Sequence, residues 1–199
     1  RGVRVGRQRV ARLMRANGLV ARGPWRRRPR TTQRAPAAVA APNRLGQDFT
    51  ASRPDEKWLA DITYIETREG WLYLALVLDL FSRAIVGWAM ADHLQATLVE
   101  SALQMALGRR SPHGDLLHHS DQGSQYTSTL VQSLLAKHHI QVSMNGVGNC
   151  YDNAPMESFI GTLKTECADA PFATRAEARQ AIFEYIEVWY NRQRLHSSL

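Results

Sequence analysis

The stretch WLADITYIETREGWLYLALVLDLFSRAIVGWAM, residues 58–90, decides the fold. β-Branched and aromatic residues fill positions 58–65, a nearly continuous apolar run follows over 71–78, and a third such segment covers 84–90. Glu69-Gly70 separates the first two segments, and residues 81–83 separate the last two. We therefore expect three strands joined by short turns, with the apolar second strand inside the sheet.

The second half of the chain alternates helical and strand patterns. Four segments have apolar residues at helical spacing: residues 97–109, 129–138, 153–166 and 174–194. Two short segments between them, 116–119 and 140–143, suit buried strands. Asn153 or Asp152 can cap the third helix, and Thr174 the fourth. Together with the first three strands, this order predicts a mixed α/β sheet with helices on its faces.

Charge divides the chain in two. Residues 1–47 contain thirteen arginines and no Asp, Glu or Lys, whereas the other 12 basic residues stand against all 18 acidic ones. An arginine-only segment is typical of contact with phosphates, although a solvated tail that only adds solubility is the alternative. The remainder, at a formal charge of −6, is unusual for a nucleic-acid binder unless its carboxylates hold cations.

The N-terminal part reads as a basic helical arm, residues 1–30. Its helix, within residues 5–19, has a narrow apolar stripe flanked by arginines and is too short to fold alone. The arginines expected to contact DNA are Arg9, Arg12, Arg15, Arg26, Arg27 and Arg28. Residues 31–52 lack periodicity and read as a linker, which leaves 53–199 as the folded body.

Membrane and export signals are missing from the sequence. No apolar run reaches the roughly 18–20 residues that a membrane span needs, and the first residues do not resemble a signal peptide. Cys150 and Cys167 do not form a zinc motif and read as two reduced thiols. We expect a cytoplasmic protein.

Three carboxylates occupy positions from which they can converge. Asp61 lies inside the first strand, Asp121 follows a short strand at its C-terminal end, and Glu157 lies in the first turn of the third helix. Singly, each has another reading: a paired structural acid, a turn former, and a residue that stabilises the helix dipole. Together, three converging carboxylates repel one another unless divalent cations neutralise them. Oxygen-only ligands select Mg²⁺ or Mn²⁺, and two such ions serve phosphoryl transfer.

Several ordered motifs carry a family resemblance: WLADITY (58–64), YLALVLDLFSR (73–83), HSDQGSQY (119–126), GNCYDNAPMESF (148–159), YNR (190–192) and RLHS (194–197). Between Asp121 and Glu157 lie 35 residues. Residues 48–199 resemble the retroviral-integrase-like transposases of bacterial insertion sequences, specifically the insertion-sequence-three family.

The resemblance implies a ribonuclease H-like fold whose D-D-E triad, Asp61, Asp121 and Glu157, binds two Mg²⁺ (or Mn²⁺) ions. It implies nicking at transposon ends by water and then attack of the freed 3′-hydroxyl on target DNA. The implied partners are transposon-end and target DNA, further copies of the chain assembled on that DNA, and an upstream-frame protein of the same element. The arm would be the remnant of a helix-turn-helix region, and the protein would associate with the nucleoid.

Further residues take roles beside the triad. In the family a basic residue at Lys164 contacts the DNA end, whereas the alternative is an exposed Glu–Lys helix face. Asn153 is expected to orient Glu157 or contact DNA.

Asp79 reads as a turn former or a partner of Arg83 rather than a fourth ligand, and His118 and His119 are left out of the metal site. Phe183, Trp189 and Tyr190 are expected to pack in the core. Asn191, Arg192 and Arg194 are candidate DNA contacts at the end of the last helix.

Two other functions compete with strand transfer. The chain lacks an initial Met and the family's fuller N-terminal region, so we expect a fragment, a truncated copy or the downstream product of two frames. A non-catalytic DNA-binding remnant that represses or competes with transposition is therefore an alternative. A ribonuclease H-like nuclease that cuts without joining is another.

Overall fold

The computed structural model describes residues 5–19, 40–112, 114–146 and 150–194. The chain divides into two compact units, residues 1–30 and 31–199. In the first unit α1 (Arg7–Ala16) forms as predicted, and it buries no side chain. Arg9, Arg12 and Arg15 are exposed on it, while Arg26, Arg27 and Arg28 lie outside the described residues.

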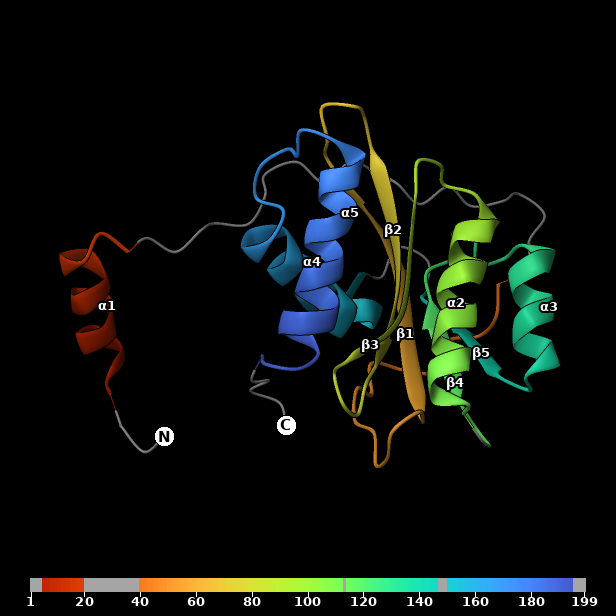
Figure 1. Ribbon diagram of the computed structural model, residues 1–199. Coiled ribbons are helices and arrows are strands. Elements are labelled where there is room, and N and C mark those ends of the chain that lie inside the picture. Colours follow the sequence, from red (N-terminus) through yellow and green to blue (C-terminus); the bar gives the residue numbers. More distant parts are fainter. Residues whose placement is uncertain (1–4, 20–39, 113, 147–149, 195–199) are drawn as a thin grey trace. The chain divides into compact units, whose positions relative to one another are not determined.

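The second unit is built on a five-stranded mixed sheet in the order β3-β2-β1-β4-β5 (Figure 1). β1 (Lys57–Ile65), β2 (Leu72–Asp79) and β3 (Ile85–Ala91) pair antiparallel through the two short turns that the sequence predicts. β4 (Leu117–Ser120) and β5 (Gln141–Met144) are parallel to β1. Parallel neighbours need crossover connections, which α2 (Ala96–Arg110) and α3 (Thr129–Lys137) supply.

Helices cover both faces of this sheet, as Figure 1 shows. Because side chains alternate along a strand, β1 contributes Leu59 and Ile65 to one apolar cluster and Trp58 and Ala60 to the other. α4 (Ala154–Glu166) and α5 (Arg175–Glu184) pack on the first cluster, and α2 and α3 on the second. The predicted mixed α/β sheet with flanking helices is confirmed.

A single glycine brings α2 close to the sheet. A Cβ atom at Gly87 in β3 would lie 2.2 Å from the carbonyl oxygen of Ala102 and 2.7 Å from the Cβ of Ala106. Both contacts are shorter than atoms tolerate, so only glycine fits between strand and helix at this point.

The last part of the predicted linker, residues 40–52, lies against the folded body. Leu45 is buried in the cluster that α4 and α5 cover, with 2% of its surface exposed. The hydroxyl of Ser143 in β5 accepts hydrogen bonds from the backbone N–H groups of Arg44 and Leu45, at 2.8 and 3.2 Å. These contacts join segments about a hundred residues apart, which explains why local periodicity does not reveal them.

The last helix differs from its prediction in one respect. Thr174 caps α5 by accepting the Glu177 N–H, as expected, but the α-helix ends at Glu184 and a π-helix, η2 (Tyr185–Tyr190), follows it. Tyr190 is buried, whereas Phe183 and Trp189 are 48% and 45% exposed. The prediction of core packing was therefore wrong for Phe183 and Trp189. Across the described ranges, no helix is both long and apolar enough to cross a membrane.

Candidate catalytic site

Asp61 lies where the central strand loses one of its neighbours. β1 pairs with β4 only from Lys57 to Leu59, while its pairing with β2 continues to Ile65. Asp61 therefore stands just past the end of β4, on a strand held by β2 alone. Its Oδ1 accepts a hydrogen bond from the backbone N–H of Ile62 at 2.7 Å, so this backbone donor has a partner.

Asp121 follows the last residue of β4 directly and opens a tight turn. Its Oδ1 accepts the Gly123 N–H at 2.9 Å. A Cβ atom at position 123 would lie 2.9 Å from the same oxygen, so glycine lets the backbone approach the carboxylate. The Asp-Gln-Gly order of the motif therefore fixes the orientation of Asp121.

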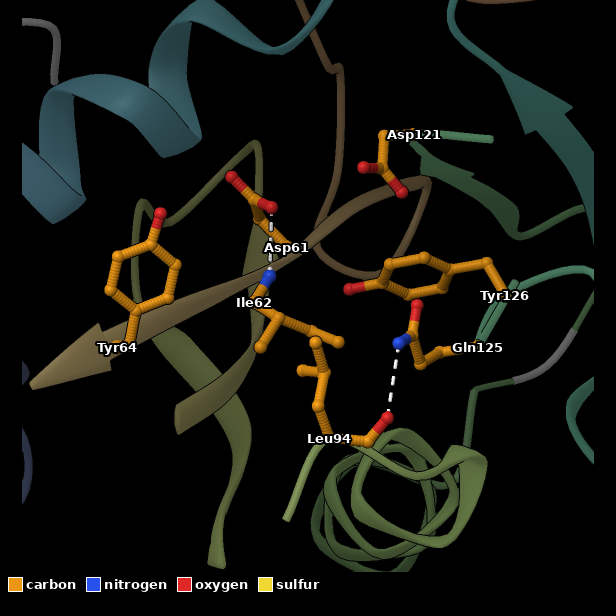
Figure 2. Close-up of a pocket in the computed structure, with 7 residues that line it drawn as sticks. All are labelled: Asp61, Ile62, Tyr64, Leu94, Asp121, Gln125 and Tyr126. Carbon is orange, nitrogen blue, oxygen red and sulfur yellow. Dashed lines mark hydrogen bonds between the residues drawn. The ribbon is translucent and has the colours of Figure 1, made fainter. Parts of the chain in front are cut away.

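A small pocket joins the two aspartates (Figure 2). Its lining residues come from β1, from the loop before α2, and from the turn after β4: Asp61, Ile62, Tyr64, Leu94, Asp121, Gln125 and Tyr126. Gln125 is held by a hydrogen bond from its Nε2 to the Leu94 carbonyl at 3.0 Å. The convergence of Asp61 and Asp121 follows from the parallel pairing of β1 and β4.

Glu157 lies in the first turn of α4, near enough to Asp61 for its charge to act on that carboxylate. Burial is the largest cause that raises the pKa of Asp61, followed by the charge of Asp121 and then by that of Glu157, and the resulting pKa is about 7. The hydrogen bond from Ile62 and the charge of Lys164 act in the opposite sense. The charges of Asp121 and Glu157 therefore both disfavour ionisation of Asp61.

The three carboxylates are a suitable donor set for a hard divalent cation, because all their ligand atoms are oxygens. Their spacing is open: within the described ranges, no three acidic, histidine or cysteine side chains are grouped closely enough to hold a metal ion as they stand. Mutual repulsion between carboxylates favours such a spacing.

Lys164 lies two helical turns beyond Glu157 on α4. Its Nζ is 4.9 Å from the centre of the Tyr64 ring, which lines the pocket. This cation–π contact places the ammonium group at the rim of the site. A basic side chain and the three acids therefore share one region of the surface.

Comparison with known proteins identifies the family. Two family models, each described as an integrase core domain, match residues 51–150 and 138–199. Over its full length the chain is 48% identical to the transposase for insertion sequence element IS904 of Lactococcus lactis, of which it spans 78%. Over 94% of its length it is 46% identical to the transposase InsF for insertion sequence IS3A of Escherichia coli, of which it spans 65%. The chain belongs to the insertion-sequence transposases.

Solved structures support the transposase fold independently. The body is similar to a chain of the simian T-cell lymphotropic virus intasome, with a TM-score of 0.60 at 18% identity, over 78% of this chain and 56% of that one. It is also similar to the Mos1 transposase catalytic domain, with a TM-score of 0.55 at 12% identity, over 69% and 72% of the two chains. The predicted ribonuclease H-like fold is confirmed. DNA strand transfer fits this transposase family, and the alternative of a non-catalytic remnant is not favoured.

Asn153 connects two parts of the transposase site in a way that the sequence did not predict. It is the N-cap residue of α4, but its side chain makes no capping hydrogen bond. Its Nδ2 instead donates to the Ala60 carbonyl at 3.3 Å, next to Asp61. The start of the Glu157 helix is thereby tied to the Asp61 strand. Contact of Asn153 with DNA stays a prediction.

Asp152 is a second connecting residue, which sequence reasoning considered only as a cap. It is buried, and its two carboxylate oxygens accept hydrogen bonds from Asn43 Nδ2 at 2.8 Å, Gln47 Nε2 at 3.0 Å and the Gly146 N–H at 3.0 Å. In the sequence, the only signal for Asp152 is its place just before the predicted helix, which does not distinguish a cap from a link between distant segments.

The remaining polar candidates lie outside the pocket lining. Asp79 is fully buried, and its carboxylate oxygens accept hydrogen bonds from the Asp55 N–H, the Ser82 N–H and the Ser82 hydroxyl. The prediction that Asp79 forms a turn is therefore confirmed. His119 contacts Ser143 Oγ at 2.8 Å and Asn145 Oδ1 at 2.6 Å. His118 is buried, and burial lowers its pKa to about 4, so it is neutral.

Proposed function

We propose that this chain cuts and joins DNA at the ends of an insertion sequence, with Asp61, Asp121 and Glu157 as ligands of two Mg²⁺ or Mn²⁺ ions. The proposal is carried by one observation: Asp61 and Asp121, brought together by neighbouring parallel strands, line one pocket. Glu157 is near enough for its charge to act on Asp61, and carboxylates gathered in this way repel one another unless cations compensate them.

Each of the three acids has a proposed role that depends on the helix or strand that carries it. Asp61 on β1 and Asp121 directly after β4 line one pocket, and Glu157 would add its oxygens from the first turn of α4. The bound cations would supply positive charge that activates the attacking oxygen and stabilises the leaving one. In the first reaction water attacks a phosphodiester and a 3′-hydroxyl leaves. In the second reaction that hydroxyl attacks a phosphodiester of the target, so that a new ester bond joins the two DNAs while a 3′-hydroxyl of the target strand leaves.

DNA contacts are assigned to the basic side chains. Lys164, held over the Tyr64 ring, is positioned to contact a phosphate as a point charge. Arg9, Arg12 and Arg15, exposed on α1, would add contacts that depend on salt but not on sequence. Since two element ends must be joined, we propose that several copies of the chain assemble on DNA. An upstream-frame protein as a further partner stays a prediction.

The proposed activity is tested by incubating the purified protein with DNA that carries the element's terminal repeat, in the presence of either Mg²⁺ or EDTA. We expect nicked and joined products only with Mg²⁺, and their loss in Asp121→Asn. Asp115→Asn is the matched control, because Asp115 is exposed and precedes β4, at the end opposite Asp121. If the wild-type yield equals that of Asp121→Asn, the proposal is refuted. Nicks without joined products would favour a nuclease instead.

A further inference from the structure

One buried hydroxyl in the catalytic pocket has no role in the packing of the protein. Tyr126 is 3% exposed, and its ring belongs to the apolar cluster that α2 and α3 cover. Its hydroxyl oxygen has no hydrogen-bond partner. A buried hydroxyl without a partner costs free energy, and a phenylalanine would fill the same apolar space without that cost.

The hydroxyl faces the pocket that the two aspartates line. Tyr126 lines the pocket together with Asp61 and Asp121, and in Figure 2 its oxygen points across the pocket toward the strand that carries Asp61. Burial is the largest cause that raises the pKa of the phenol well above its usual value, followed by the charges of Asp61 and then Asp121. The group therefore stays protonated and keeps a hydrogen to donate.

The backbone of Tyr126 is held by hydrogen bonds, and its ring is packed in the apolar cluster. The Tyr126 N–H donates to the Gly123 carbonyl at 3.0 Å, within the turn that Asp121 opens. Its own carbonyl accepts Gln132 Nε2 at 2.7 Å. The ring also contacts His118, with 6.2 Å between ring centroids, but both nitrogens of His118 lack hydrogen-bond partners as well. The direction of the hydroxyl is therefore set by the fold, and its partner has to enter from the pocket.

The pocket has room for such a partner. Its cavity volume is about 40 Å³, against the ~10–15 Å³ that one water needs. Two acidic side chains at its wall make a cation with its attached oxygens the expected occupant.

We propose that Tyr126 is a positioning residue whose hydroxyl donates a hydrogen bond to an oxygen atom that a divalent cation brings into this pocket. The oxygen belongs either to water on the ion or to a DNA phosphate. The inference rests on the proposed function, since both need a cation between Asp61 and Asp121. A neutral hydroxyl suits this position because it can donate a hydrogen bond to the oxygen. Unlike a positively charged donor, it does not compete with the cation for the carboxylates.

The experiment compares wild type with Tyr126→Phe, Tyr185→Phe and Asp61→Asn. Tyr185 is the matched control, since it is also a buried tyrosine but its hydroxyl donates to Glu166 Oε2 at 2.8 Å, away from the pocket residues. Three quantities are measured: stability to urea in EDTA, the Mg²⁺ concentration that gives half of the Mg²⁺-induced rise in Tm, and affinity for terminal-repeat DNA with Ca²⁺.

We expect Tyr126→Phe to keep or raise stability in EDTA, whereas Tyr185→Phe lowers it. If the oxygen is water on the ion, the Mg²⁺ midpoint of Tyr126→Phe rises about ten-fold. If it is a DNA phosphate, the Mg²⁺ midpoint is unchanged and DNA affinity in Ca²⁺ falls about ten-fold. Tyr185→Phe changes neither quantity.

Two results would overturn the role of Tyr126 and leave the proposed function standing. In the first, Tyr126→Phe matches wild type in both binding measurements; in the second, it loses stability in EDTA as Tyr185→Phe does. If wild type itself shows no Mg²⁺ effect beyond that of Asp61→Asn, the proposed function fails and the Tyr126 role fails with it.

Discussion

Replacing Asp61 with asparagine should make the metal-free protein more stable. Burial, Asp121 and Glu157 raise the pKa of Asp61 to about 7 in the folded state, against about 3.9 for an unfolded aspartate. At about 1.4 kcal/mol for each pKa unit, holding this carboxylate ionised at pH 8 costs about 4 kcal/mol. The asparagine Oδ1 can still accept the Ile62 N–H, so Asp61→Asn removes the charge and keeps that hydrogen bond.

The pH dependence gives the sign of the effect. Because the folded pKa lies above the unfolded one, the folded state binds more protons between about pH 3.9 and pH 7, and stability falls as pH rises through this window. The advantage of Asp61→Asn should therefore be largest at pH 8 and about half as large at pH 5.5. A gain of 2 to 4 kcal/mol corresponds to a Tm rise of roughly 4 to 16 °C for a chain of this size.

The assay is unfolding by heat and by urea in EDTA at both pH values, followed by circular dichroism. Asp79→Asn is the control, because that buried carboxylate accepts three hydrogen bonds and its loss should destabilise the protein by about 1–3 kcal/mol. Mg²⁺ should stabilise the wild type and have little effect on Asp61→Asn. If Asp61→Asn is no more stable than wild type at pH 8, or if its gain is the same at pH 5.5, the electrostatic reasoning is wrong.

Three further substitutions test the fold and the DNA contact. Gly87→Ala should destabilise the body by about 3 kcal/mol or more, measured by urea unfolding, because the added Cβ meets the Ala102 carbonyl; a neutral result would contradict the close approach of α2. Leu45→Ala should cost about 2–5 kcal/mol in the same assay, and a loss under 0.5 kcal/mol would mean that residues 40–52 do not belong to the body. Lys164→Ala should weaken binding to terminal-repeat DNA and reduce the slope of log affinity against log salt by about 1; an unchanged slope would argue against a phosphate contact.

Much of the sheet could be predicted because its strands carry their own local signals. The β-branched and aromatic residues of β1 and the apolar run of β2 each form a signal over a few neighbouring residues, and the turn at Gly70 separates them. The meeting of Asp61 and Asp121 could be anticipated as well, since a carboxylate at the end of a parallel strand lies at the edge where such folds form sites.

The parts that could not be predicted depend on contacts between distant segments. Leu45 lies in a stretch without periodicity, and its burial and the hydrogen bonds of this stretch to Ser143 and Asp152 show that it is folded. Asn153 has the residue type of a helix cap, but the Ala60 carbonyl is its hydrogen-bond acceptor. The unpartnered hydroxyl of Tyr126 becomes apparent only when the surrounding side chains are placed.

The position of β1 has a mechanical consequence for the three acids. β1 is the central strand, with ladders to β2 and β4, so Asp61 and the neighbouring Asp121 share a stationary framework. Glu157 is carried by a helix that rests on this framework through side chains and the Asn153 hydrogen bond. A change in the spacing between Glu157 and the two aspartates would therefore come from the Glu157 side chain or from a shift of α4, which can move without breaking a strand ladder.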